Sequence, residues 1–283
     1  MEQYSIGRVF SRAFEQVKSN FWTLLGFVIL SYLLTSTITL MAAIPLLASI
    51  GMNASAIAAS GGVHDPSAML ALLSAPSFWL SIFFVIVVAL LAYSVMYAGA
   101  FHCLGASSYG ERPSLGSCFG VAFKRALPLF LTLMLAALGI MLGYLLLIVP
   151  GIILALMWSV AMPASVLEGL GAIESLGRSR QLTKGSKGMI FLTHLLVFVI
   201  VIIVEFIVLG IFRVSTTAML GAGGQPSPAA LGGALVGALI MQLVLMIFAI
   251  FVMLMMLSLQ VSIYRETLLV TEGRDSGIAD VFR

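Results

Sequence analysis

The sequence predicts an all-α integral membrane protein with six transmembrane helices, and three observations support this fold class. Of the 283 residues, 61% are hydrophobic and only 9% are charged, and the mean hydropathy is +1.16. Six apolar runs are long enough to cross a bilayer, and the basic residues gather between alternate runs. Soluble domains carry about 25% charged residues. A chain with so few charges must therefore present most of its surface to lipid.

The apolar runs define the expected spans, because about 20 helical residues cross a hydrocarbon core of about 30 Å. Backbone groups in lipid must be satisfied within the segment, which favours helices over an open sheet. The first run, residues 21–50, is too long for the hydrophobic part of a signal peptide, which has roughly 7–15 residues. The expected spans lie near residues 21–50, 77–101, 127–149, 151–167, 189–212 and 233–259.

Only Pro150 and Gly151 interrupt the third and fourth runs. A single helix over both runs would be far too long for a bilayer, so we expect two spans joined by a minimal turn at this pair. Proline ends the first helix or opens the second, and glycine permits the turn. A re-entrant hairpin is the alternative.

Lysine and arginine residues set the expected orientation. All of the 14 basic residues except Arg213 fall on one side of the predicted topology, and the positive-inside rule assigns that side to the cytoplasm. We therefore expect both termini in the cytoplasm. Residues 51–76 and the Gly- and Pro-rich residues 214–232 are expected as external loops. Topology and anionic lipid explain the net charge of +3, which does not indicate nucleic-acid binding.

An internal repeat relates residues 5–14, which read SIGRVFSRAF, to residues 114–123, which read SLGSCFGVAF. Serine, glycine, phenylalanine, alanine and phenylalanine recur at the same offsets, with apolar residues at i, i+3 and i+4 spacing. We expect amphipathic helices over 5–19 and 114–125 that lie along the cytoplasmic interface and lead into a span. Their phenylalanines should face apolar surroundings: Phe10, Phe14, Phe119 and Phe123.

A weaker third copy precedes span five, around Ile173 and Leu176. It predicts a three-fold repeat in which each unit combines an interfacial helix with a pair of spans. These helices either anchor the spans or sense lipids and partner proteins.

Residues 148–185 resemble a known family. The motif reads IVPGII, continues through Trp158, Pro163 and the pair Glu168-Gly169, and ends in ESLGRSRQLTKG. It is similar to the bacterial membrane-domain family that includes the domain fused to some glycerophosphodiester phosphodiesterases and its stand-alone inner-membrane relatives. The resemblance implies a multi-span bacterial inner-membrane protein. This sequence holds no soluble phosphodiesterase part, so we expect no hydrolytic activity to carry over.

The inventory of ionisable residues argues against an enzyme. The three histidines are scattered, and no metal-ligand spacing, nucleophile elbow or phosphate-binding glycine loop is present. We therefore expect no cofactor and no metal; a catalyst built from isolated intramembrane residues is the alternative. Cys103 and Cys118 lie on the predicted cytoplasmic side, where a disulfide is not expected, and they lack the histidine spacing of a zinc site.

Glu205 is the clearest candidate for a polar site within the membrane, because it interrupts the apolar run of span five. A carboxylate in lipid costs about 2.5–3.5 kcal/mol on insertion scales, so we expect it to face the bundle interior. Gln242 in span six lies at a similar expected depth, Arg213 could reach down from the outer end, and His194 shares the helical face. Glu205 is then either a structural acid or a proton- or solute-coupled site.

The basic segment before span five is a candidate site for lipid headgroups. Arg178, Arg180, Lys184 and Lys187 could each gain about 1 kcal/mol near an anionic surface, unless they serve only to set the topology. Arg178 is also expected to pair with Glu174, one turn earlier on the same helix.

Two small-residue motifs indicate close helix packing. Gly139 with Gly143 in span three, and Gly233 with Gly237 in span six, place glycines four residues apart. Packing within the chain is the simpler interpretation of both pairs, and oligomerisation is the alternative.

Together these patterns favour a non-enzymatic inner-membrane accessory or scaffold protein that organises lipid or partner membrane proteins. The alternative is a transporter of a small solute or lipid, with a polar site around Glu205. A transporter should show discontinuous helices with paired polar residues at midplane, whereas this sequence offers one clear intramembrane acid.

Overall fold

The computed structural model describes residues 3–48, 70, 73–220 and 228–273, and within these residues it contains helices and no strand. The side chains of residues 211–220, 228–231 and 233–235 also fall outside this description. The predicted all-α membrane fold is confirmed, because six helices are long and apolar enough to span a bilayer. They are Phe21–Ala48, Pro76–Ser108, Leu115–Leu146, Ile148–Leu167, Lys187–Gly210 and Val236–Glu272.

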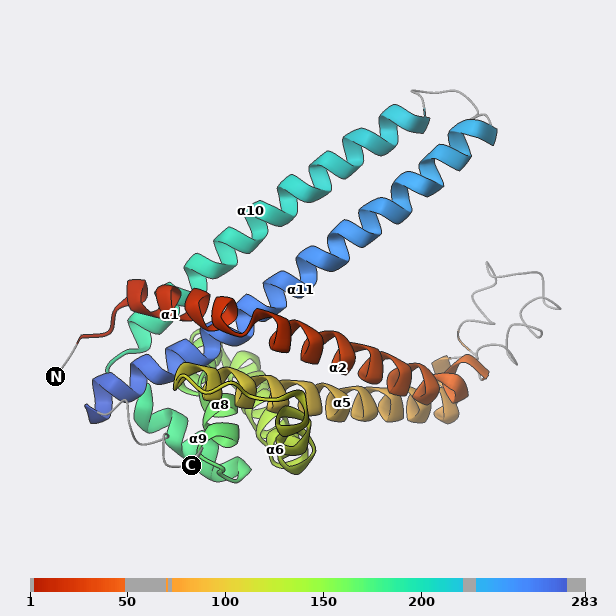
Figure 1. Ribbon diagram of the computed structural model, residues 1–283. Helices are drawn as coiled ribbons and strands as arrows, with labels where there is room; N and C mark the ends of the chain where they lie inside the picture. Colours follow the sequence, from red (N-terminus) through yellow and green to blue (C-terminus); the bar gives the residue numbers. More distant parts are fainter. Residues whose placement is uncertain (1–2, 49–69, 71–72, 221–227, 274–283) are drawn as a thin grey trace.

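The described helices form three successive units, and in each unit the chain runs outward and then returns. They are α1 (Ile6–Ser19), α2 (Phe21–Ala42) and α5 (Pro76–Ser108), then α6 (Leu115–Leu146), α7 (Ile148–Met157) and α8 (Ala161–Leu167), then α9 (Ala172–Leu182), α10 (Lys187–Leu220) and α11 (Pro228–Glu272). Because outward and returning helices alternate, α1, α8, α9 and the end of α11 meet at one end of the molecule (Figure 1). We call this end, with residues 254–272 of α11 and the end of α5, the base.

The α2–α5 hairpin and the α10–α11 hairpin diverge from the base (Figure 1). Buried residues are concentrated at the base and are rare in the outer parts of the α10–α11 hairpin. Along α11 the fully buried apolar residues lie between Leu254 and Leu268, and no residue between 236 and 251 is buried. The hydrophobic core therefore lies at the base. It includes Val9, Phe27, Phe101, Leu104, Cys118 and Tyr264.

The turn between α6 and α7 lies at Leu147, so the predicted turn at Pro150-Gly151 is wrong. Leu147 has an extended backbone (φ −166°, ψ 153°). Pro150 fits within the first turn of α7, where its missing N–H removes no intrahelical bond. Gly151 serves packing instead, because its Cα lies 3.0 Å from where a Cβ on Gly143 would stand. One turn earlier in α6, Gly139 lies against the Trp158 ring. For the other motif, the surroundings of Gly233 lie outside the described residues.

The internal repeat is visible as a shared register in the three amphipathic segments, which begin after Ser5, Ser114 and Gly171. The residues four and eight positions after these caps are buried in every copy: Val9 and Ala13, Cys118 and Ala122, Ser175 and Ser179. The residue at the ninth position is exposed in every copy: Phe14, Phe123 and Arg180. The serine hydroxyls of the first two caps each accept a backbone N–H three residues later, which supports the first turn.

One detail of the expected repeat is wrong. Residues 115–125 form no separate helix, because α6 continues unbroken into its span. In the other two copies the amphipathic helix ends before the span, at Asn20 (φ −129°) after α1 and at residues 183–186 after α9. Phe10 and Phe119 pack against the core, but Phe14 and Phe123 are 59% and 62% exposed and point away from the protein. These two rings are therefore available to lipid.

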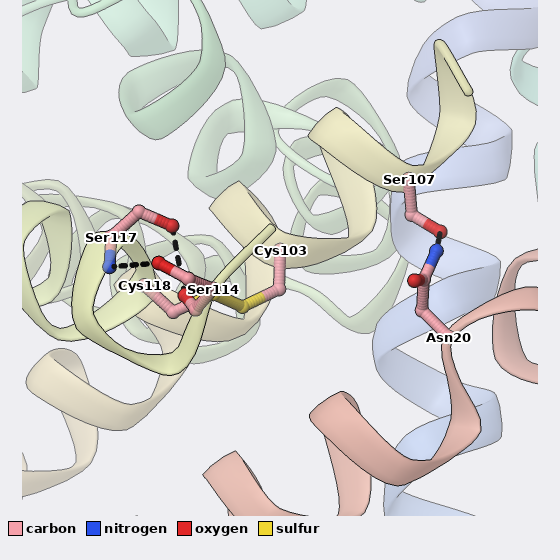
Figure 2. Close-up of a disulfide and its surroundings, with 6 residues drawn as sticks. All are labelled: Asn20, Cys103, Ser107, Ser114, Ser117 and Cys118. Carbon is pink, nitrogen blue, oxygen red and sulfur yellow. Dashed lines mark hydrogen bonds between the residues drawn. A yellow bond between two sulfur atoms is a disulfide. The ribbon is translucent and has the colours of Figure 1, made fainter. Parts of the chain in front are cut away.

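A disulfide joins Cys103 of α5 to Cys118 of α6, contrary to the expectation of free thiols (Figure 2). The Cα atoms lie 5.7 Å apart, within the usual range for a disulfide. The repeat explains the pairing, since Cys118 occupies the buried position four residues after the Ser114 cap and so faces α5. Both sulfurs are fully buried, which keeps soluble thiols away from the bond.

The predicted external loops lie largely outside the described residues. Helices α10 and α11 extend into the segment 214–232 from both sides, to Leu220 and from Pro228, so its ends are helical rather than loop. Residues 51–69 of the first loop, Glu2 and Arg283 are not described.

Candidate functional site

Glu266 of α11 is the centre of the polar base. Its side chain is 0% exposed, and its hydrogen bonds with described residues all come from Ser5, Arg8 and Arg12 of the first amphipathic segment. Oε1 accepts from the Ser5 backbone N–H at 2.8 Å and from Arg8 Nη2 at 2.7 Å, and Oε2 accepts from Arg12 Nη1 at 3.1 Å. The Nε–H of Arg8 lies 3.0 Å from Oε1, completing a forked contact.

These contacts explain why a carboxylate can be buried at this position. An uncompensated charge in a protein interior is strongly destabilising, and Glu266 is compensated by two guanidinium groups. The Ser5 N–H adds a donor at the N-terminus of α1, where the helix dipole favours a negative group. Glu266 therefore fixes α1 across the inner end of α11.

A second ion-pair network centres on Arg178 of α9. Its Nε–H lies 2.9 and 2.8 Å from the two carboxylate oxygens of Glu168, and its Nη1 donates to Glu272. The hydroxyl of Tyr264 donates to Glu168 at 2.6 Å. The hydrogen bond to Glu272, followed by those to Glu168, raises the pKa of Arg178 above its usual value despite partial burial. The network thus joins α9 to the end of α8 and to α11.

Neutral side chains complete the attachment of α1. Gln16 is buried, accepts from the Ser258 hydroxyl of α11 at 2.8 Å, and donates to the Ser108 hydroxyl of α5 at 2.8 Å. Asn20 donates to Ser107 at 2.7 Å (Figure 2). Buried polar groups are costly without such partners, so these bonds specify where α1 sits as well as holding it there.

The base consequently acts as a clamp. The ion pairs among its described residues join three arginines to three glutamates, and each of these carboxylates bonds to an arginine rather than facing a cavity. Among the described residues, no group of three or more His, Cys, Asp or Glu side chains could hold a metal ion. These ion pairs hold α1, α8, α9 and α11 in position relative to one another.

The structure divides the four predicted headgroup ligands. Arg178 is committed to the clamp, and it does not pair with Glu174. Glu174 instead accepts the Gly171 N–H at 3.1 Å and closes the first turn of α9. Arg180 and Lys184 are exposed, while Lys187 is half-buried at the start of α10. Only these last three remain available to an external anion.

The predicted intramembrane site around Glu205 is not assembled as expected. Glu205 is exposed and lines a cavity of about 500 Å³ between α10 and α11, with seven apolar residues. It does not face the interior of a six-helix bundle, because α10 and α11 leave the base as a separate hairpin. Gln242 and His194 are exposed and do not line this cavity; His194 Nδ1 lies 2.9 Å from the Ile190 carbonyl oxygen. The side chain of Arg213 is not described.

Sequence reasoning missed Glu266, and it named Glu168 within a motif without predicting that this carboxylate binds Arg178. Glu266 and Arg8 are separated by 258 positions, and neither stands out by spacing. One signal was available: Glu266 is an acid two turns before the end of a long apolar helix, at the membrane edge that collects basic residues.

No known protein-family model matches the chain, and no characterised protein or solved structure matches it either. The resemblance to the membrane domain of glycerophosphodiester phosphodiesterases therefore stays a prediction, and the argument for function rests on geometry.

Proposed function

We propose that this chain is a non-enzymatic accessory or scaffold protein that organises partner membrane proteins or lipid between its two diverging hairpins. We further propose that it resides in a bacterial inner membrane with both termini in the cytoplasm. The orientation is supported by the one-sided distribution of basic residues. On this proposal the base is the cytoplasmic end.

The observation that carries the proposal is the apolar surface on the outer halves of the hairpins. Leu33 of α2, Phe206 of α10 and Leu239 of α11 are 57%, 74% and 71% exposed. The described outer parts of α10 and α11 are apolar apart from Glu205 and Gln242. In α2 the hydroxyls of Thr35, Ser36 and Thr37 donate to backbone carbonyls of the same helix, so these helices suit lipid or another transmembrane helix. The clamp at the base holds the hairpins apart, because it fixes their inner ends and leaves their outer ends unconnected.

A photo-crosslinking experiment in intact membranes tests this proposal. A photoreactive amino acid is placed at Leu33 or at Phe206, and the matched control carries it at Leu145, an equally apolar exposed residue on the α6–α7 hairpin. The proposal expects Leu33 and Phe206 to give the same protein adduct or the same lipid adduct, which Leu145 does not give. Adducts shared by all three positions would contradict it.

A transporter of a small solute or lipid is kept as the second candidate because of one observation. Glu205 lines the cavity between α10 and α11, and no hydrogen bond or ion pair engages it within the part of the chain that the structure describes. Acids inside membranes are costly and often mark functional sites. Glu205 is thus available to a proton or to a bound solute.

Replacing Glu205 with glutamine separates the two functions, because glutamine keeps the shape and hydrogen bonding but cannot titrate. The accessory function expects Glu205→Gln to restore full growth or envelope integrity to a strain that lacks the protein. The measurement is complementation at matched membrane levels, with Gln242→Ala as a control outside the cavity. Loss of complementation in Glu205→Gln alone would favour the transporter.

A further inference from the structure

A polar groove lies where the chain before α1, the turn between α9 and α10, and the end of α11 meet. Its volume is about 560 Å³, and its lining includes Gln3, Tyr4, Lys184, Ser186, Met189 and Thr271. It lies at the base, beside the inner ends of two spans, and it is separate from the cavity at Glu205. The clamp does not use the Lys184 ammonium or the Ser186 hydroxyl.

Two donors of this groove, the Lys184 ammonium and the Ser186 hydroxyl, are not engaged elsewhere in the described part of the chain. Lys184 is exposed, and no ion pair to it is formed within the residues that the structure describes. Ser186 is only 4% exposed, yet its hydroxyl has no hydrogen-bond partner among the described atoms. Because Ser186 lines the groove, its hydroxyl can donate to a molecule bound there.

The start of α10 adds backbone donors beside Ser186. The Ser186 carbonyl oxygen accepts the Ile190 N–H at 2.9 Å, which places Ser186 at the N-cap. A capping serine usually accepts an N–H from the first turn of its helix, but the Ser186 hydroxyl accepts none. The N–H groups of Lys187, Gly188 and Met189 are therefore left for an outside acceptor. Helix N-termini of this kind favour anions.

The surrounding charges also favour an anion. Two acids of the neighbouring end of α11, Glu266 and Glu272, are both bound to arginines. Within the described part of the chain, Lys184 forms no ion pair with a carboxylate. A phosphate group, with its several acceptor oxygens, fits an ammonium, a hydroxyl and a set of free N–H groups.

The apolar neighbours point to a lipid as the source of that phosphate. Met189 lines the groove, and Leu192, one turn further along α10, is 46% exposed and faces outward along the span. A headgroup bound at Lys184 and Ser186 would leave its acyl chains beside this exposed face. A free phosphate ion would not use these residues.

We propose that this groove binds the phosphate of an anionic glycerophospholipid at the inner membrane edge. The inference rests on the proposed membrane-organising function and names a lipid class for it. It would add a fixed lipid to the base, next to α1 and the α10–α11 hairpin. The groove is separate from the outer hairpin surfaces. If the groove binds no lipid, the crosslinking result expected at Leu33 and Phe206 is therefore unchanged.

The test is native mass spectrometry of the full chain in detergent, titrated with phosphatidylglycerol. Lys184→Gln should weaken the tightest binding step about fivefold, since a lysine near an anionic surface contributes about 1 kcal/mol. Ser186→Ala should weaken it several-fold through the lost hydrogen bond. The matched control is Arg180→Gln, which removes an exposed charge that lies outside the groove and should leave this step unchanged.

Two further titrations identify the source of the phosphate. Phosphatidylcholine should bind more weakly than phosphatidylglycerol, because its headgroup carries no net charge, and inorganic phosphate should not displace the bound phosphatidylglycerol. Equal losses in Arg180→Gln and Lys184→Gln would overturn the proposal in favour of a diffuse basic surface. Displacement by inorganic phosphate would overturn the assignment to a lipid.

Discussion

Replacing both Arg8 and Arg12 with glutamine should destabilise the protein by about 3 kcal/mol. Breaking a buried ion pair from one side costs about 3–5 kcal/mol, and the lower end applies because water partly screens the two arginines. Glu266 would then keep a fully buried carboxylate without a charged partner. The measurement is the unfolding midpoint of the purified protein in denaturant, compared with Lys18→Gln, which removes an exposed charge from the same helix.

A third variant shows whether the cost arises from the stranded carboxylate. Adding Glu266→Gln to the double variant removes the buried charge, and it should recover much of the lost stability, because a neutral buried group costs far less than an unpaired charge. A double variant as stable as Lys18→Gln would show that Glu266 does not hold α1. A triple variant no more stable than the double would show that the arginines act through other contacts.

Gly143 should tolerate no side chain. A Cβ at this position would lie 3.0 Å from the Gly151 Cα and 2.8 Å from a Leu154 methyl, so α6 and α7 would have to separate. We expect Gly143→Ala to lower stability by about 1–3 kcal/mol, as overpacking does, and Gly143→Leu to lower it further. Backbone atoms cannot rotate aside as a flexible side chain can, which makes this contact more severe than most.

Gly120, on the same helix, provides the matched control. A Cβ at Gly120 meets nothing within 4 Å, and alanine is preferred over glycine in a helix by roughly 1 kcal/mol. Gly120→Ala should therefore be neutral or stabilising. Opposite signs for Gly120→Ala and Gly143→Ala, measured by thermal unfolding in one detergent, are the expected result. Equal effects would contradict the close α6–α7 contact.

The spans were predictable because hydropathy reports directly on lipid contact. The ends of the helices were harder to predict. Helix α11 continues to Glu272, past the predicted end of the span at residue 259. Its last turns pack against α1 and α9 instead of contacting lipid. The repeat could also be predicted from the sequence, because its buried positions recur at fixed offsets from Ser5 and Ser114. Those offsets predicted which face packs, but not that α1 would break from its span while α6 would not.

The candidate sites were harder to predict, because they depend on pairs far apart in sequence. A local rule paired Arg178 with Glu174, yet in the fold Glu168 and Glu272 compete more successfully for the guanidinium. Glu205 was correctly located within a span, but its orientation depends on how two hairpins leave the base. Neither hydropathy nor helical periodicity contains that information.

The divergence of the two hairpins is the central structural claim, and distances between spin labels in lipid nanodiscs test it most directly. One pair joins Thr37 of α2 to Ile207 of α10, both well away from the base. The other pair joins Trp22 to Leu192, near the base, and all four residues are exposed. The buried Cys103–Cys118 disulfide should not take up label. The account predicts a clearly longer distance for Thr37–Ile207 than for Trp22–Leu192. Equal distances, as in a closed bundle of parallel spans, would contradict it.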